Sequence, residues 1–193
     1  MMHAEVNNFI KTVKKLYPSK FRFRKALEVG SLCVNGSPRK YFNLMRKYIG
    51  HDLTKGRGVD VVGRIEDSHY INEFDIVIST ECAEHDSGWK STLKCMYKAL
   101  KPGGLLVFTC AGPHRAEHGT TRTSPKDSPV TNNYYKNISI EEFEKVLSPD
   151  MFTFYQLQYA RGKNDLQFFG SKKDFRHPAT QEIYQALKNN QLK

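Results

Sequence analysis

The sequence predicts an α/β fold: a doubly wound, mostly parallel sheet between two layers of helices, ending in a C-terminal β-hairpin. Three observations support this Rossmann-like three-layer sandwich. Strand-like and helix-like segments alternate through most of the chain, as βαβ units require. The segments at 74–79 and 105–109 are almost wholly apolar, as expected of strands covered on both faces. Two further strand-like segments, at 152–159 and 166–169, are separated by a short polar stretch and so predict the hairpin.

The elements can be placed in order from the N-terminus. A helix over 8–17 has apolar residues at helical spacing and ends at Pro18. Further strands are expected at 25–29, 48–52 and 59–62, and further helices at 37–48, 88–100, 140–147 and 181–187. Ser139 and Glu142 have the spacing of a capping box at the start of the helix over 140–147.

The domain organisation follows from length and composition. The 193 residues suit one domain over 1–193, with an N-terminal helical extension over 1–24. Residues 110–138 show little apolar periodicity and are rich in Gly, Pro, Thr, Ser and His, which predicts a long substrate loop.

Targeting signals and cysteine usage suggest where the chain works. No apolar run approaches the roughly 20 residues that span a bilayer, and the first residues lack the apolar stretch of a secretion signal. The four cysteines form no C-x-x-C pair and are expected to be free thiols in a reducing compartment. We therefore expect a cytoplasmic protein with no membrane partner.

The net charge of +10 leaves two interpretations open. It could give the protein a basic face for nucleic acid, or it could only aid solubility. Lysines and arginines are spread along the chain, and no aromatic-plus-basic motif of an RNA-binding module is present. Nucleic acid is thus a possible partner, a small molecule is the favoured one, and the oligomeric state is undetermined.

The loop after the first strand is the first place to look for a ligand site. Open parallel sheets bind ligands beyond the carboxyl ends of their strands. Gly30 and Gly36 bracket a turn where backbone can approach a ligand closely. Asp52 ends the second strand about twenty residues after Gly30, the position of a carboxylate that accepts hydrogen bonds from ribose hydroxyls.

Four sequence blocks, in this order, carry a family resemblance. They are Leu27-Glu28-Val29-Gly30-Ser31, Tyr48-Ile49-Gly50-His51-Asp52-Leu53, Phe74 to Thr80 followed by Glu84-His85, and Leu100-Lys101-Pro102-Gly103-Gly104-Leu105. With them the chain resembles the class I S-adenosylmethionine-dependent methyltransferases, near the type 11 group. The resemblance covers about 25–112, with a looser match to about 172.

The resemblance implies S-adenosylmethionine as cofactor, S-adenosylhomocysteine as product, and a set of binding residues. These are Glu28, Gly30, Ser31, Gly36, Asp52, Leu53, Ile65 and Thr80. Two departures concern cofactor contacts. Leu32 stands where the family has a glycine, within a longer loop, and Arg64 stands where an aspartate often meets the adenine amino group. Glu66 or Asp67 could supply that carboxylate instead.

Candidate catalytic residues lie at the strand ends and in the long loop. A positioned His or carboxylate can remove the proton from an oxygen acceptor, and we select His85, Glu117 and His118, with Glu81 and His114 as further candidates. His114, Glu117 and His118 also form the H-x-x-E-H string of one zinc protease group. Pro113 and Gly119 flank that string and oppose a helix, so no metal site is expected.

Several functions remain open. The leading one is methyl transfer to a small-molecule or sugar-like acceptor, because little extra chain is present for a docking domain. RNA or nucleotide methylation is the alternative within enzymes, and a non-catalytic S-adenosylmethionine-binding interaction protein is the alternative outside them. A nicotinamide enzyme is disfavoured, since G-x-G-x-x-G is absent after the first strand.

Overall fold

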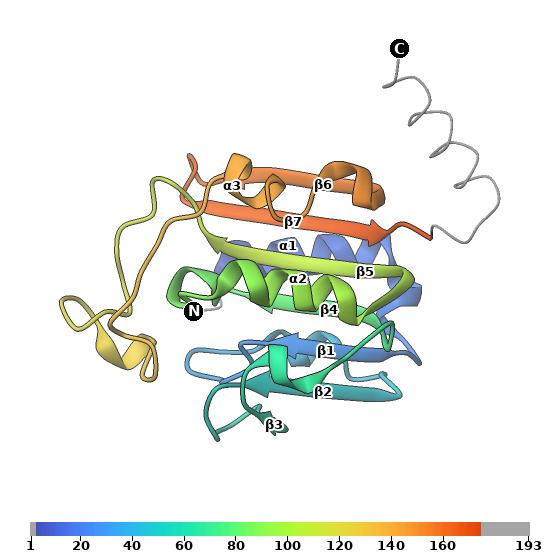
Figure 1. Cartoon of the computed structure of the whole chain (residues 1–193), viewed down its shortest axis with the longest axis horizontal. Helices are drawn as coiled ribbons and strands as arrows, with labels where there is room; N and C mark the ends of the chain where they lie inside the picture. Colours follow the sequence, from blue (N-terminus) through green and yellow to red (C-terminus); the bar gives the residue numbers. More distant parts are fainter. Residues whose placement is uncertain (1–2, 175–193) are drawn as a thin grey trace, which may run out of the picture.

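A seven-stranded sheet runs through the computed structural model, which describes residues 3–174. Its order is β3-β2-β1-β4-β5-β7-β6 (Figure 1). The strands are β1 (Lys25–Val29), β2 (Lys47–Asp52), β3 (Val61–Val62), β4 (Phe74–Thr80), β5 (Leu100–Ala111), β6 (Phe152–Ala160) and β7 (Asp165–Lys172). Strands β1 to β5 are parallel to one another, and β7 and β6 run antiparallel at one edge. The predicted sheet and its C-terminal hairpin are confirmed.

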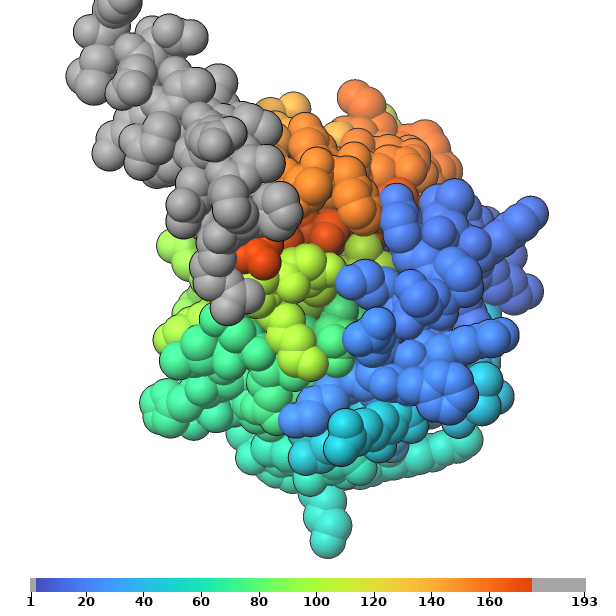
Figure 2. Space-filling model, turned by 90° about the vertical axis from the view of Figure 1, so that its right-hand side faces the viewer, coloured from blue at the N-terminus to red at the C-terminus, as the bar shows by residue number. Residues whose placement is uncertain are grey.

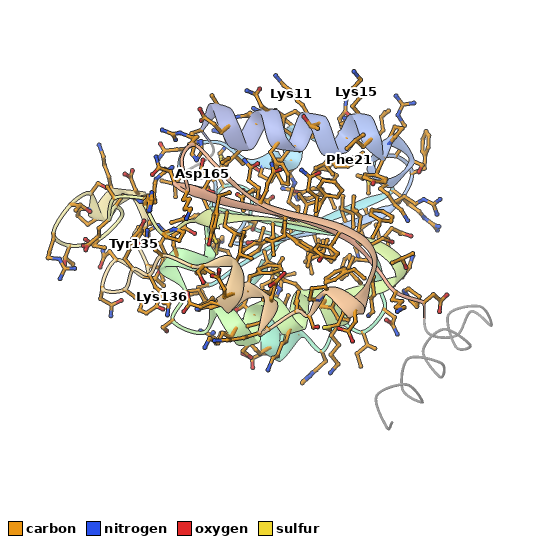
Figure 3. The ribbon with its side chains drawn as sticks, turned by 90° about the horizontal axis from the view of Figure 1, so that it is seen from above. Lys11, Lys15, Phe21, Tyr135, Lys136 and Asp165 are labelled. Atoms are coloured by element: carbon orange, nitrogen blue, oxygen red, sulfur yellow. The ribbon has the colours of Figure 1, made fainter. Side chains whose placement is uncertain are left out.

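Helices cover both faces of the sheet, as the predicted three-layer sandwich requires. Helix α1 (Ala4–Leu16) packs on one face, and α2 (Trp89–Ala99) and α3 (Ile140–Glu144) pack on the other. Seen from above, Lys11 and Lys15 of α1 point away from the sheet and Phe21 points toward it (Figure 3). Helix α1 is therefore part of the core and not an appended extension.

The central strands contribute side chains to both hydrophobic clusters. In β4, Ile76 and Ile78 face α1, whereas Val77 faces α2. Because successive side chains of a strand point to opposite faces, a strand covered on both faces reads as a continuous apolar run. This is the physical reason that β4 and β5 could be found from the sequence.

The N-terminal segment also closes the end of the sheet where the parallel strands begin. Short 3₁₀ turns at Pro18–Phe21 and Pro38–Tyr41 pack beside α1. Lys20 donates a hydrogen bond from Nζ to the carbonyl of Gly103, at 2.7 Å, near the start of β5. Figure 2 views the molecule from this end and shows the blue N-terminal segment beside the lime-green part of the chain. The carboxyl ends of the parallel strands, where a ligand is expected to bind, therefore lie at the opposite end of the sheet from these contacts.

The predicted helix over 37–48 is wrong. Ser37 and Pro38 start only one 3₁₀ turn, and the chain then runs extended into β2. The amide of Phe23 donates to Leu44 and the amide of Arg46 donates to Arg24, so this segment pairs with the residues before β1. Backbone pairing here overrides the helical spacing of the apolar residues.

The other differences are smaller. The third strand shrinks to two residues, and the helix that begins at the confirmed Ser139–Glu142 capping box ends at Glu144. No helix in the described residues is long and apolar enough to cross a membrane. The helix expected over 181–187 lies outside the described residues.

Candidate active site

A cavity opens at the carboxyl ends of β1, β2 and β4. It encloses about 1020 Å³, including its open mouth. This is the edge at which open parallel sheets bind ligands. Of the residues selected from the sequence, those that line it are Glu28, Gly30, Gly36, Asp52, Leu53, Ile65, Glu66, Thr80, Glu81 and His85.

The turn after β1 is built around Gly30. Its φ of +76° suits glycine, and a Cβ at this position would collide with the Cys82 side chain. The amides of Gly30 and Ser31 donate to the carbonyl of His51 at 3.0 and 3.2 Å, which ties the turn to β2. Ser31 is buried behind this turn and is not part of the cavity wall.

Glu28 is the last charged residue of β1 and is 2% exposed. Its carboxylate accepts hydrogen bonds from Tyr48 Oη at 2.7 Å and from Ser37 Oγ at 3.2 Å. Burial raises the pKa of Glu28 to about 7, although both hydrogen bonds favour the charged form. A carboxyl group that is poised to ionise thus faces the cavity.

Asp52 and Leu53 close the neighbouring side at the end of β2. Asp52 Oδ2 accepts a hydrogen bond from the Leu32 amide at 2.8 Å, which fastens the longer glycine loop to β2. Leu53 is 37% exposed and offers an apolar surface at the cavity wall. Gly36, with a φ of +106°, lies at the far end of the same loop.

The segment after β3 places one carboxylate at the cavity. Arg64 forms ion pairs with Glu66 at 3.3 Å and Asp86 at 3.5 Å. Glu66 lines the cavity, and its Oε2 is buried without a hydrogen-bond partner. Ile65 lies between them, 5% exposed, whereas Asp67 does not reach the cavity.

The turn after β4 leaves Thr80 at the cavity and places Glu81 in a left-handed conformation, with φ of +52°. Glu81 accepts hydrogen bonds from Thr109 Oγ1 at 2.8 Å and from the His3 ring at 3.3 Å. Non-glycine residues rarely adopt this conformation, and it concentrates at functional sites. It directs the chain into the short 3₁₀ turn Ala83–His85.

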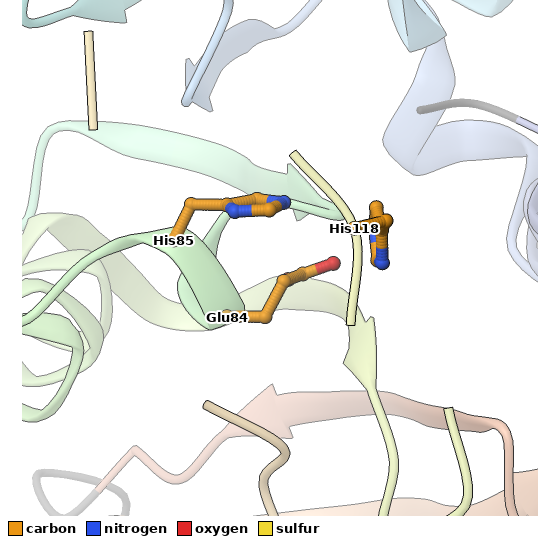
Figure 4. A group of neighbouring side chains, drawn as sticks. All are labelled: Glu84, His85 and His118. Carbon is orange, nitrogen blue, oxygen red and sulfur yellow. The ribbon is translucent and has the colours of Figure 1, made fainter. Parts of the chain in front are cut away.

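That turn and the long loop bring three ionisable side chains together. One ligand-type atom from each of Glu84, His85 and His118 lies within 4.8 Å of the others (Figure 4). The two imidazole rings meet edge to face, with centroids 5.1 Å apart. Burial, and then the charge of Glu81, raises the pKa of Glu84 to about 8; burial, and then His118, lowers the pKa of His85 to about 4. His85 lines the cavity, and His118 lies behind it.

Glu117, selected as a catalytic candidate, does not join this group. Its carboxylate pairs with Arg122 at 2.8 Å and accepts a hydrogen bond from Thr120 at 2.6 Å, away from the cavity wall. His114 contacts the carbonyl of Gly162 at 2.8 Å. The H-x-x-E-H string therefore does not converge, because no helix aligns its side chains.

The loop over 112–137 forms part of the cavity wall. It leaves the carboxyl end of β5 and extends beyond the sheet (Figure 1). Residues 127–131 line the cavity opposite the glycine loop, and Asn35 Nδ2 donates to Asp127 Oδ1 at 3.3 Å. Asn137 holds the loop's base by donating to the carbonyl of Arg115 at 2.8 Å. The loop therefore lies at the cavity, and its role in substrate binding stays a prediction.

Some site residues could not be selected from the sequence. Residues 127–131 carry no motif, and only the fold brings them over the cavity. The sequence shows Glu84 as part of a Glu-His pair, but it does not show that the Glu84 side chain is completely buried. Glu66 was one of two alternatives, and the unpartnered oxygen now distinguishes it from Asp67.

Comparison with known proteins identifies a domain within the chain. A family model described as a methyltransferase domain matches residues 33–108. No curated protein sequence matches the chain.

Solved structures show the same fold. The chain is similar to the CurJ carbon methyltransferase, with a TM-score of 0.59, 17% identity, and coverage of 89% of this chain and 56% of that one. It is similar to the 1,6-didemethyltoxoflavin-N1-methyltransferase of Burkholderia thailandensis, bound to its substrate and S-adenosylhomocysteine, with a TM-score of 0.60, 14% identity, and coverage of 86% and 78%. It also resembles a Haemonchus contortus phosphoethanolamine N-methyltransferase bound to S-adenosyl-L-methionine, with a TM-score of 0.61, 18% identity, and coverage of 86% and 52%.

These comparisons confirm the predicted fold and the resemblance to a methyltransferase domain over residues 33–108. The chain spans just over half the length of the first of these structures. At this level of identity the likeness concerns the fold, and the chemistry has to be argued from the chain's own residues.

Proposed function

We propose that this chain is a cytoplasmic S-adenosylmethionine-dependent methyltransferase that acts on a small-molecule acceptor. The observation that carries the proposal is the cavity at the carboxyl ends of β1, β2 and β4, because it gathers residues that the family resemblance assigns to the cofactor. Four free cysteines fit a reducing compartment. The acceptors of the similar structures support the small-molecule class: 1,6-didemethyltoxoflavin in one and phosphomonomethylethanolamine in another.

The cavity has the polar groups that the cofactor needs. Glu28 would face the methionine ammonium, and Asp52 would accept hydrogen bonds from the ribose hydroxyls. The close packing of Gly30 against Cys82 lets backbone approach the ligand without a side chain in between. Thr80 would lie near the sulfonium.

The part of the cavity proposed to hold the adenine ring offers the most direct test of whether the cofactor fits. Glu66 Oε2 is buried and lacks a hydrogen-bond partner. Buried polar atoms without partners are costly, so such an atom marks a place where a donor is expected. The adenine amino group is a suitable donor, with Leu53 and Ile65 as apolar contacts beside the ring. Glu66 thus replaces the aspartate that is absent at Arg64.

When bound, the cofactor supplies a methyl group whose bond to sulfur breaks as an acceptor lone pair forms the new bond, which leaves neutral S-adenosylhomocysteine. The protein contributes alignment and shelter from water. His85 would stand on the acceptor side, with His118 packed against it, and a neutral imidazole can take up an acceptor proton or bind a metal ion. Residues 127–131 would cover the acceptor.

Cofactor binding is the direct test. Calorimetry with S-adenosylmethionine and S-adenosylhomocysteine is expected to show one site per chain. Asp52→Ala should weaken binding at least about tenfold, because hydrogen bonds to a charged group are worth roughly 1.5–3 kcal/mol. Asp67→Ala is the matched control, since Asp67 lies nearby but outside the cavity. Absence of binding by the wild type contradicts the proposed function, and equal affinity of Asp52→Ala contradicts the ribose role.

The net charge of +10 favours a second candidate, an RNA or nucleotide acceptor. Phosphate contacts make affinity fall steeply with salt. An RNA role predicts binding of single-stranded or structured RNA that weakens strongly between about 50 and 200 mM salt. Salt-independent or absent binding would remove this candidate.

A further inference from the structure

We propose that Glu84, His85 and His118 form a binding site for a divalent transition-metal ion beside the cofactor cavity. The sequence predicted no metal site, because the H-x-x-E-H string lacks a helix. In the structure, only His118 of that string belongs to the cluster, where it lies close to two residues from the turn after β4. The site is thus assembled by tertiary contacts that the spacing of the string does not show.

The ligand geometry is close to that of a bound ion. One ligand-type atom of each residue lies within 4.8 Å of the others. Tetrahedral ligands at about 2.0–2.1 Å from zinc lie ~3.4 Å apart, so side-chain rotations that move these atoms by about 1 Å would complete the site. In Figure 4 the Glu84 carboxylate points toward the space between the two imidazole rings.

The three side chains have unused ligand atoms. Both carboxylate oxygens of Glu84, Nδ1 of His85 and Nε2 of His118 are buried with no hydrogen-bond partner. Glu84 is 0% exposed and has no ion pair among the described residues. A buried carboxyl group without a hydrogen-bond partner is unfavourable, and a bound cation, which would displace the carboxyl proton, supplies the missing partner.

The surroundings orient the rings for this role. His118 Nδ1 is 3.2 Å from the carbonyl of Ala116, and the hydroxyl of Tyr135 donates to the same carbonyl at 3.2 Å. A backbone acceptor at Nδ1 selects the tautomer that leaves Nε2 free to bind an ion. The Tyr135 ring also packs on both imidazoles, with centroids 5.1 and 5.5 Å away.

A second group of ligand-type residues differs in how its carboxylates are paired. His3, Glu81 and Asp165 also lie close together. There, however, Arg115 pairs with Asp165 at 2.8 Å, and His3 and Thr109 donate to Glu81. Asp165 Oδ2 has no hydrogen-bond partner, but Arg115 and the His3 ring lie beside these two carboxylates, whereas no such side chain pairs with Glu84 among the described residues.

The donor set indicates the kind of ion and its use. Two imidazoles and one carboxylate suit Zn²⁺ or a similar transition metal better than Mg²⁺ or Ca²⁺. Three protein ligands leave one coordination position open. His85 lines the cavity, so an oxygen atom of an acceptor could fill that position and be held near the methyl group. This orienting role rests on the proposed function, whereas ion binding itself does not.

The test uses the full chain without an affinity tag, after removal of metal with a chelator. Titration with Co²⁺ should produce a visible absorption spectrum of nitrogen and oxygen coordination, and calorimetry with Zn²⁺ should give one ion per chain. His118→Ala and Glu84→Gln should each weaken binding at least about tenfold, since each removes a ligand. His114→Ala, in the same loop but outside the cluster, should bind as wild type does.

The outcomes separate this inference from the proposed function. Thermal unfolding of each variant shows that it folds; His118 lies in a loop, so its replacement is the safer of the two. If the wild type binds S-adenosylmethionine but takes up neither ion, the metal site is refuted and the proposed function stands. Unchanged ion binding by His118→Ala also refutes the site. If the ion binds as predicted but the cofactor does not, the proposed function fails and the metal site stands.

Discussion

The burial of Glu28 makes the stability of the fold depend on pH. It is 2% exposed, and burial raises its pKa from an ordinary 4.5 to about 7. The folded state therefore holds its proton more tightly than the unfolded state between about pH 4.5 and 7. The contribution of Glu28 to the free energy of unfolding is therefore fully present below pH 4.5, and it is lost as pH rises through about 7.

The corresponding prediction compares Glu28→Gln with wild type in urea unfolding at several pH values. The free energy of unfolding of the wild type, relative to the variant, should fall as pH rises through that window, by about 1.4 kcal/mol per pKa unit at most. A difference that is constant from pH 4.5 to 8 would contradict the raised pKa.

Alanine substitutions at Gly30 and Gly103 distinguish the cost of backbone strain from the cost of a steric clash. Both have a positive φ, +76° and +72°, but a Cβ on Gly30 would meet Cys82, whereas a Cβ on Gly103 would meet nothing within 4 Å. Gly103→Ala should cost only the left-handed strain, roughly 1–2 kcal/mol. Gly30→Ala should cost about 1–3 kcal/mol more, from overpacking. Thermal unfolding measures both, and equal losses would show that Cys82 moves aside.

At the scale of elements, Lys172 connects the C-terminal hairpin to α2. Its Nζ donates to the carbonyls of Leu100 at 2.7 Å and Tyr97 at 3.0 Å, at the C-terminal end of the helix, and to Asn72 at 3.0 Å. These are carbonyls that a helix end leaves without intrahelical partners. Burial lowers the pKa of Lys172 to about 8.

Lys172→Met should therefore destabilise the protein by about 1–3 kcal/mol, because it leaves buried carbonyls without a donor. Lys94→Met, on the exposed face of α2, should change stability by less than about 0.5 kcal/mol. Denaturant unfolding measures both. Equal stability of the two variants would show that water replaces the Nζ contacts.

At the scale of the whole molecule, α1 covers the face of the sheet opposite α2. Val6, Phe9, Ile10 and Val13 are buried against the face of the sheet formed by β4 and β5. Ile10→Asp would bury a charge in this cluster and should prevent folding. Lys11→Asp, one residue away but pointing outward (Figure 3), should fold normally. Circular dichroism distinguishes the two, and a folded Ile10→Asp protein would show that α1 is dispensable.

The sequence by itself determined the strands and one side of the site. Continuous apolar runs identify β4 and β5 because both faces of these strands are covered. The carboxyl ends of parallel strands lie at one edge of a sheet, so Glu28, Asp52 and Thr80, which lie at or near the ends of three predicted strands, were expected at that edge. These inferences need only local patterns and the topology of open sheets.

Only the tertiary structure decided the rest. The segment over 37–48 has helical spacing, yet it pairs with the residues before β1, because a long-range backbone ladder is more favourable there than a local helix. His118 lies in an irregular loop without periodicity, so nothing in its spacing reveals that it meets Glu84 and His85. Contacts between segments far apart in the chain depend on how the loop packs, and this packing brings one ligand-type atom of each of the three residues within 4.8 Å of the others.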